Sequence, residues 1–134
     1  MPHFSFAIAE AVVAGAVLGS LADWLFAGVL FHDRYRRHPE VWRDAVGERG
    51  RILAAQALTL LTSTVMVLLA VGLGRTNLCG AVKLALAVWL IAPLPMLVTN
   101  HMFIKIDVLV TASHAIGWLV KLLLIAGVIA LLLR

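Results

Sequence analysis

Three ionisable side chains recur at a fixed spacing in the last hydrophobic stretch of the chain, residues 106–133. Asp107, His114 and Lys121 follow one another at steps of seven residues. Seven residues are close to two turns of an α-helix, so the three side chains are predicted to share one helix face. Ionisable groups in a membrane-spanning helix are costly unless they face the protein interior or water. This stripe is therefore the first candidate for a functional site.

Glu10, in the first apolar stretch, is the predicted partner of Lys121. The helical rise places Glu10 roughly 9 Å along its helix, near the level that the long stem of Lys121 can reach. Lys83 competes for the same carboxylate, and the sequence does not decide between the two lysines. Such pairs could serve only to fix helix register. Alternatively, Glu10, Asp107, His114 and Lys121 line a pathway for a proton, an ion or a ligand, in which histidine passes the proton.

A second polar cluster is predicted at the end of the bundle where Asp107 lies, formed by Asp23, Asn100 and His101. We expect no metal ion and no other cofactor. The five histidines include no His-Glu-x-x-His pair, and the single Cys79 excludes an intrachain disulfide and a cysteine-based zinc cluster. No phosphate-binding glycine loop or nucleophile motif is present either, so no catalytic residue is assigned.

The composition places these residues in a membrane protein. Of the 134 residues, 63% are hydrophobic, and the mean hydropathy is +1.02. A soluble domain of this size cannot bury so much apolar surface. The long, unbroken apolar runs favour helices over a membrane β-barrel. We therefore predict an all-α fold, an integral membrane four-helix bundle.

The predicted single domain has four spans, at residues 4–31, 52–73, 78–98 and 106–133. Each exceeds the roughly 20 residues that cross a bilayer core. Pro93 removes a backbone donor and is expected to kink or end the third helix near residues 89–91. Residues 32–51 form the one long polar loop, in which Pro39, Val41 and Trp42 suggest a short interfacial helix.

The basic residues of this loop predict the orientation: Arg34, Arg36, Arg37, Arg43, Arg49 and Arg51. Loops rich in Arg and Lys stay on the cytoplasmic side, so both termini are expected outside. The predicted location is a bacterial-type inner (cytoplasmic) membrane. The expected partners are the lipid bilayer and, at this loop, anionic lipid headgroups; nucleic acid is not an expected partner.

Small residues on the first helix predict close helix packing. The side chains that follow one another at steps of four are Ala7, Ala11, Gly15, Gly19, Asp23 and Ala27. Small side chains at this spacing let helix backbones approach closely. Ala11, Gly15 and Gly19 could pack against a helix of the same chain or against a second subunit, and we expect a homo-oligomer through this face.

The chain resembles a known family through several loosely spaced residues: Gly15, Gly19, Trp24, Phe26, Trp42, Trp89, Pro93, Gly117 and Trp118. In these features it is similar to the small bacterial four-helix membrane proteins of domain of unknown function 1761. The resemblance implies a four-helix membrane fold and supplies no activity or functional residue. The polar residues favour transport or conduction of a proton, an ion or a small solute. The alternatives are a non-catalytic lipid- or ligand-binding membrane subunit and a membrane-embedded enzyme that uses His114.

Overall fold

The computed structural model of the protein describes residues 2–33 and 47–134, which are helical nearly throughout. The first span consists of α1 (Pro2–Asp23) and η1 (Trp24–Leu30), a π-helical continuation. It is followed by α3 (Glu48–Gly72), α4 (Leu78–Ile91), α5 (Pro93–Phe103) and α6 (Val108–Leu132). Within the described residues, four helical segments are long and apolar enough to cross a membrane. The predicted all-α four-helix fold is thus confirmed.

The third span is broken at the position that Pro93 indicated. α4 ends at Ile91, and α5 begins at Pro93, where the missing backbone donor of proline is tolerated because the first amides of a helix have no partner within it. Ala92 joins the two helices with non-helical backbone angles, φ −121° and ψ −71°. α5 continues to Phe103, five residues beyond the end expected at residue 98.

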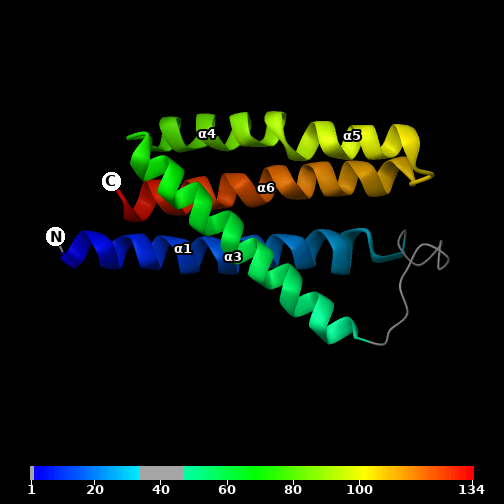
Figure 1. The fold of residues 1–134 in the computed structure, drawn as a ribbon, viewed down its shortest axis with the longest axis horizontal. Coiled ribbons are helices and arrows are strands. Elements are labelled where there is room, and N and C mark those ends of the chain that lie inside the picture. The colour runs from blue at the N-terminus through cyan, green and yellow to red at the C-terminus, as the bar shows by residue number, and fades with distance from the viewer. Residues whose placement is uncertain (1, 34–46) are drawn as a thin grey trace.

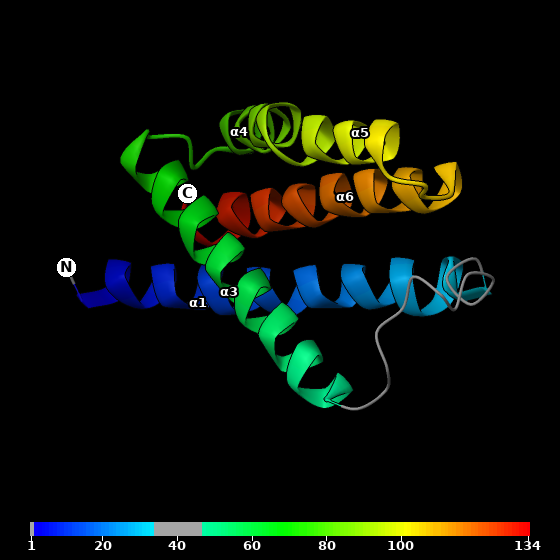
Figure 2. The same ribbon diagram turned by 45° about the vertical axis from the view of Figure 1, so that its right-hand side comes forward.

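α6 is the central helix of the bundle. It lies between α1 on one side and the α4–α5 span on the other, and α3 crosses α1 and α6 obliquely (Figures 1 and 2). Half of the apolar window of α6 is buried inside the protein, compared with 17–22% for the other spans. The polar side chains that sequence patterning placed on this helix therefore meet protein on several sides.

Both ends of the described chain lie at the same end of the bundle, as four crossings require (Figure 1). α1 and α6 consequently run in opposite directions along each other. Two further boundaries differ from those expected: α3 begins at Glu48 rather than at residue 52, and α6 begins at Val108 after the capping residue Asp107. The expected interfacial helix around Trp42 lies outside the described residues.

The small-residue face of α1 is used inside the chain. Ala11 is fully buried, and a Cβ atom on Gly15 would lie 2.5 Å from the Ser63 Oγ of α3. Ser63 donates a hydrogen bond of 2.8 Å to the backbone carbonyl of Val12. A Cβ on Gly19 would lie 3.0 Å from Thr59 and 3.2 Å from the Lys121 stem. The expectation that this face joins two subunits is therefore wrong, because α3 and α6 already cover it. The homo-oligomer itself stays a prediction.

Candidate functional site: an ion pair between the first and last spans

An ion pair joins α1 to α6 deep within the apolar helices. The Lys121 Nζ atom lies 2.6 Å from the Asp23 Oδ2 atom, and the side chains are 5% and 41% exposed, respectively. Asp23 is the last residue of α1, and Lys121 lies near the middle of α6. The lysine is enclosed by protein, whereas part of the aspartate remains accessible.

Two further side chains hold the pair in place. The Thr59 hydroxyl of α3 donates a hydrogen bond of 3.1 Å to the same oxygen of Asp23, and Thr59 is itself buried. The Lys121 ammonium also lies 4.3 Å from the centroid of the Trp118 ring. A cation over the face of an indole ring is attracted by the ring quadrupole. Three spans therefore meet at this pair, and Gly19 allows them to approach closely.

A cavity of about 180 Å³ opens beside the exposed side of Asp23. Its polar lining comes from Asp23, Gln56, Ser113 and His114, so that three spans contribute to it. His114 lies within electrostatic reach of both Asp23 and Lys121. The Ser113 side chain is 1% exposed, and its hydroxyl has no hydrogen-bond partner among the described residues. A buried hydroxyl without a partner is costly, so it marks a place where a bound molecule would find a contact.

The predicted pairing of Lys121 with Glu10 is wrong. Glu10 is exposed on α1, and thirteen residues separate it from Asp23, which turns it roughly 220° away around the helix. Side chains on a helix lean toward its N-terminus, so the Lys121 stem reaches back along α6, the direction in which Asp23 lies. The pairing predicted from the sequence assumed that the Lys121 stem points toward the C-terminal end of α6. Lys83, the competing lysine, is also exposed.

The other predicted polar residues lie at the junction between α5 and α6. Asp107 caps α6, because its carboxylate accepts a hydrogen bond of 2.7 Å from the Leu109 amide. The Thr111 hydroxyl lies 3.4 Å from the His101 Nδ1 atom, and the Asn100 carbonyl accepts a hydrogen bond from the Ile104 amide. These contacts stabilise the chain reversal. Asp23, which was grouped with them, instead binds Lys121.

Two features of the candidate site were missed in the sequence. The first is Asp23 as the partner of Lys121, although Asp23 continues the steps of four that include Gly15 and Gly19 and therefore lies on the closely packed face. The second is Ser113, which has no distinguishing signal beyond its place beside His114. Within residues 2–33 and 47–134, no three His, Cys, Asp or Glu side chains lie close enough to hold a metal ion.

Fold and site together define a class of protein: a membrane-type four-helix bundle whose first and last spans share an ion pair between a buried lysine and a partly exposed aspartate. The chain belongs to the family described as protein of unknown function (DUF1761), whose model matches residues 10–130. The resemblance inferred from the sequence is thereby confirmed, and the match covers all four spans. Neither the curated proteins nor the solved structures include a match to the chain.

Proposed function

We propose that the protein binds and translocates a proton or a small monovalent cation at Asp23. The observation that carries this proposal is the ion pair itself, together with the cavity that reaches one of its two partners. Charged groups within membrane spans are costly, and in such proteins they usually mark the path of an ion or a substrate. If the ion pair served only to fix the register of the helices, apolar packing would serve equally well.

The two side chains of the ion pair are unequally exposed, which supports a mechanism in which the Asp23 carboxylate exchanges Lys121 for a proton or a cation. Lys121 is almost fully enclosed, whereas Asp23 is 41% exposed and lines the cavity. A proton or cation that enters the cavity can therefore reach Asp23 without displacing any helix. Once a proton or cation neutralises Asp23, the Lys121 ammonium is left without its counter-charge in apolar surroundings, which is costly.

The lining of the cavity limits the kind of cargo. Among the described residues, one carboxylate faces the cavity, which suits a proton or a monovalent ion better than a divalent metal ion, whose sites hold several acidic or carbonyl ligands. Gln56 offers a neutral amide oxygen from a second span, and Ser113 lines the cavity from a third. His114 lines the same cavity, and a neutral imidazole has one nitrogen that donates and one that accepts a hydrogen bond. We assign it the role of carrying protons between the cavity and Asp23.

Flux measurements in proteoliposomes test this proposal. Vesicles that contain a dye sensitive to pH, to Na⁺ or to K⁺ are subjected to a gradient of the corresponding ion. The Asp23→Asn variant is expected to abolish the flux. Asp107→Asn is the matched control, because it removes a carboxylate that caps a helix outside the ion pair, and it is expected to retain the flux. No flux of protons, Na⁺ or K⁺ through the unaltered protein would refute the proposed function.

We also propose the orientation that the arginines of residues 32–51 indicate, with this loop at the cytoplasmic face beside anionic lipid headgroups. The single cysteine provides a direct test. Cys79 is exposed in the first turn of α4, next to the turn that this orientation places outside. A maleimide that cannot cross membranes should label Cys79 in intact bacterial spheroplasts. Labelling only after the membrane is opened would reverse the proposed orientation.

A further inference from the structure

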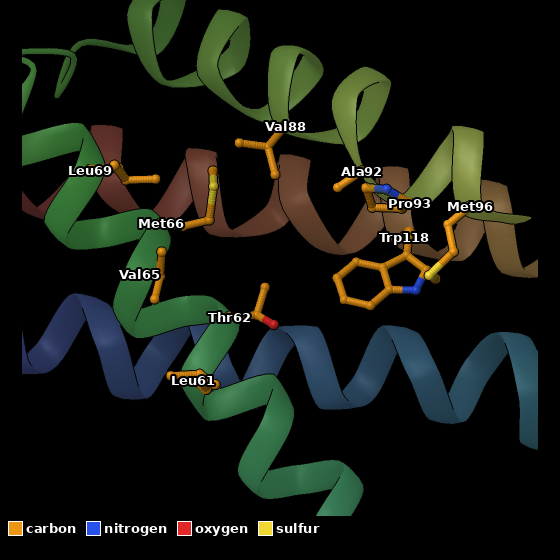
Figure 3. A pocket seen from close by; sticks show the side chains of 10 residues that line it. All are labelled: Leu61, Thr62, Val65, Met66, Leu69, Val88, Ala92, Pro93, Met96 and Trp118. Atoms are coloured by element: carbon orange, nitrogen blue, oxygen red, sulfur yellow. The ribbon is translucent and has the colours of Figure 1, made fainter.

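A second, larger cavity lies between α3 and the α4–α5 span and shares Trp118 with the cavity beside the ion pair. Its volume is about 360 Å³. Figure 3 shows its walls: Leu61 and Val65 belong to α3, Val88 and Met96 to the opposite span, and Trp118 projects from α6. The groove exists because α3 crosses the bundle obliquely while the opposite span is interrupted between Ile91 and Pro93.

The walls of this groove offer almost nothing to a polar molecule. Thr62 is the one lining side chain with a hydroxyl group, and it already donates its proton to the Leu58 carbonyl of its own helix at 2.9 Å. Apolar cavities stay dry, because a water molecule needs two or more polar partners. Methionine side chains such as Met96 adapt easily to an irregular apolar occupant. Water and polar solutes are therefore poor occupants.

The groove is continuous with the surface that faces lipid. Leu61, Val65 and Met96 are 57%, 45% and 55% exposed, and all three belong to segments long and apolar enough to cross a membrane. In a bilayer, hydrocarbon chains surround such segments. We propose that this groove binds one hydrocarbon chain of a membrane lipid, which packs against Trp118. The proposal rests on the groove alone and does not require the cation chemistry proposed at Asp23, although Trp118 belongs to both sites.

Tryptophan fluorescence tests the proposal, since Trp118 lines the groove. A variant that carries Trp24→Phe, Trp42→Phe and Trp89→Phe keeps Trp118 as its single tryptophan. The protein in detergent is titrated with small amounts of phosphatidylcholine brominated in mid-chain, because bromine quenches indole fluorescence on contact. A second variant that keeps only Trp24, which is 63% exposed on the lipid-facing surface, reports unspecific lipid contact. We expect Trp118 to be quenched at a lower lipid fraction than Trp24.

Variants that fill the groove complete the test. Ala92→Phe is expected to abolish the preferential quenching of Trp118, whereas Ala87→Phe, at an exposed position of α4 outside the groove, should leave it unchanged. Val65→Phe fills the groove from the α3 side and serves if Ala92→Phe does not fold. Equal quenching of Trp118 and Trp24 would overturn the proposal, as would preferential quenching that survives both fillings. Protection of Trp118 that increases with protein concentration would also overturn it, since a second copy of the chain would then cover the groove.

Discussion

Removing either partner of the Asp23–Lys121 pair should destabilise the protein, and the two removals should differ in size. Asp23→Asn leaves a lysine ammonium that is only 5% exposed, whereas Lys121→Met leaves a carboxylate that is 41% exposed to the cavity. An unpaired charge costs more when solvent cannot reach it. Asp23→Asn is therefore the more damaging of the two single substitutions.

The geometry gives the size of the effect. Two unit charges 2.6 Å apart attract by about 6 kcal/mol at the effective dielectric constant of proteins, before desolvation is subtracted. Breaking a buried pair on one side costs about 3–5 kcal/mol. We expect a loss in this range for Asp23→Asn, and about 2 kcal/mol for Lys121→Met because the remaining carboxylate is partly exposed. The double variant should lose less than Asp23→Asn alone, since no unpaired charge then remains.

Reversible unfolding in mixed micelles, followed by circular dichroism, measures these differences. Glu10→Gln is the matched control, because it neutralises an exposed carboxylate on the same helix and should change the free energy of unfolding by less than about 0.5 kcal/mol. Losses that simply add in the double variant would show that the two charges do not interact. Asp23→Asn indistinguishable from Glu10→Gln would refute the reasoning altogether.

Three other substitutions test how the helices are held together, each by the same unfolding measurement. Gly15→Ala should cost about 1–3 kcal/mol because its Cβ would lie 2.5 Å from the Ser63 Oγ, whereas Gly127→Ala, with open space around it, should be neutral or slightly stabilising. Asn77→Ala should cost about 1 kcal/mol, since its side chain caps α4; no loss would show that the cap is dispensable. Trp89→Phe should cost about 1 kcal/mol, because the indole donates a hydrogen bond of 2.8 Å to the α6 backbone; an unchanged stability would show that this bond adds nothing.

The spans follow from the sequence because length and apolarity alone decide whether a helix can cross a bilayer. The break at Pro93 follows in the same way, since proline lacks the donor that a continuous helix needs at that point. The contacts between side chains of different helices cannot be predicted in this way. Lys121 could be recognised as buried, but its counter-charge depended on how α1 and α6 are rotated and on the direction in which the lysine stem leans.

The three residues of the stripe, Asp107, His114 and Lys121, have different surroundings in the structure, for reasons that their spacing does not contain. A spacing of seven places Asp107, His114 and Lys121 on one face, but it does not say where the helix begins. α6 begins at Val108, so Asp107 becomes its cap. Ser113 lies one residue from the stripe, yet it is among the most buried polar side chains of the helix. The burial of a side chain depends on how the surrounding spans pack, and the residue pattern of one helix contains no information about that packing.

The helix changes from α to π geometry directly after Asp23, beside the cavity that its carboxylate lines. In η1 the Phe31 amide donates to the Phe26 carbonyl five residues earlier, so the backbone is wider than in α1. Phe26 then packs over Gly117, where an added Cβ would already lie 3.4 Å from its ring. Phe26 and Gly117 both line the cavity beside Asp23. The π-helical segment that follows Asp23 thus supplies part of the wall of the cavity that reaches its carboxylate.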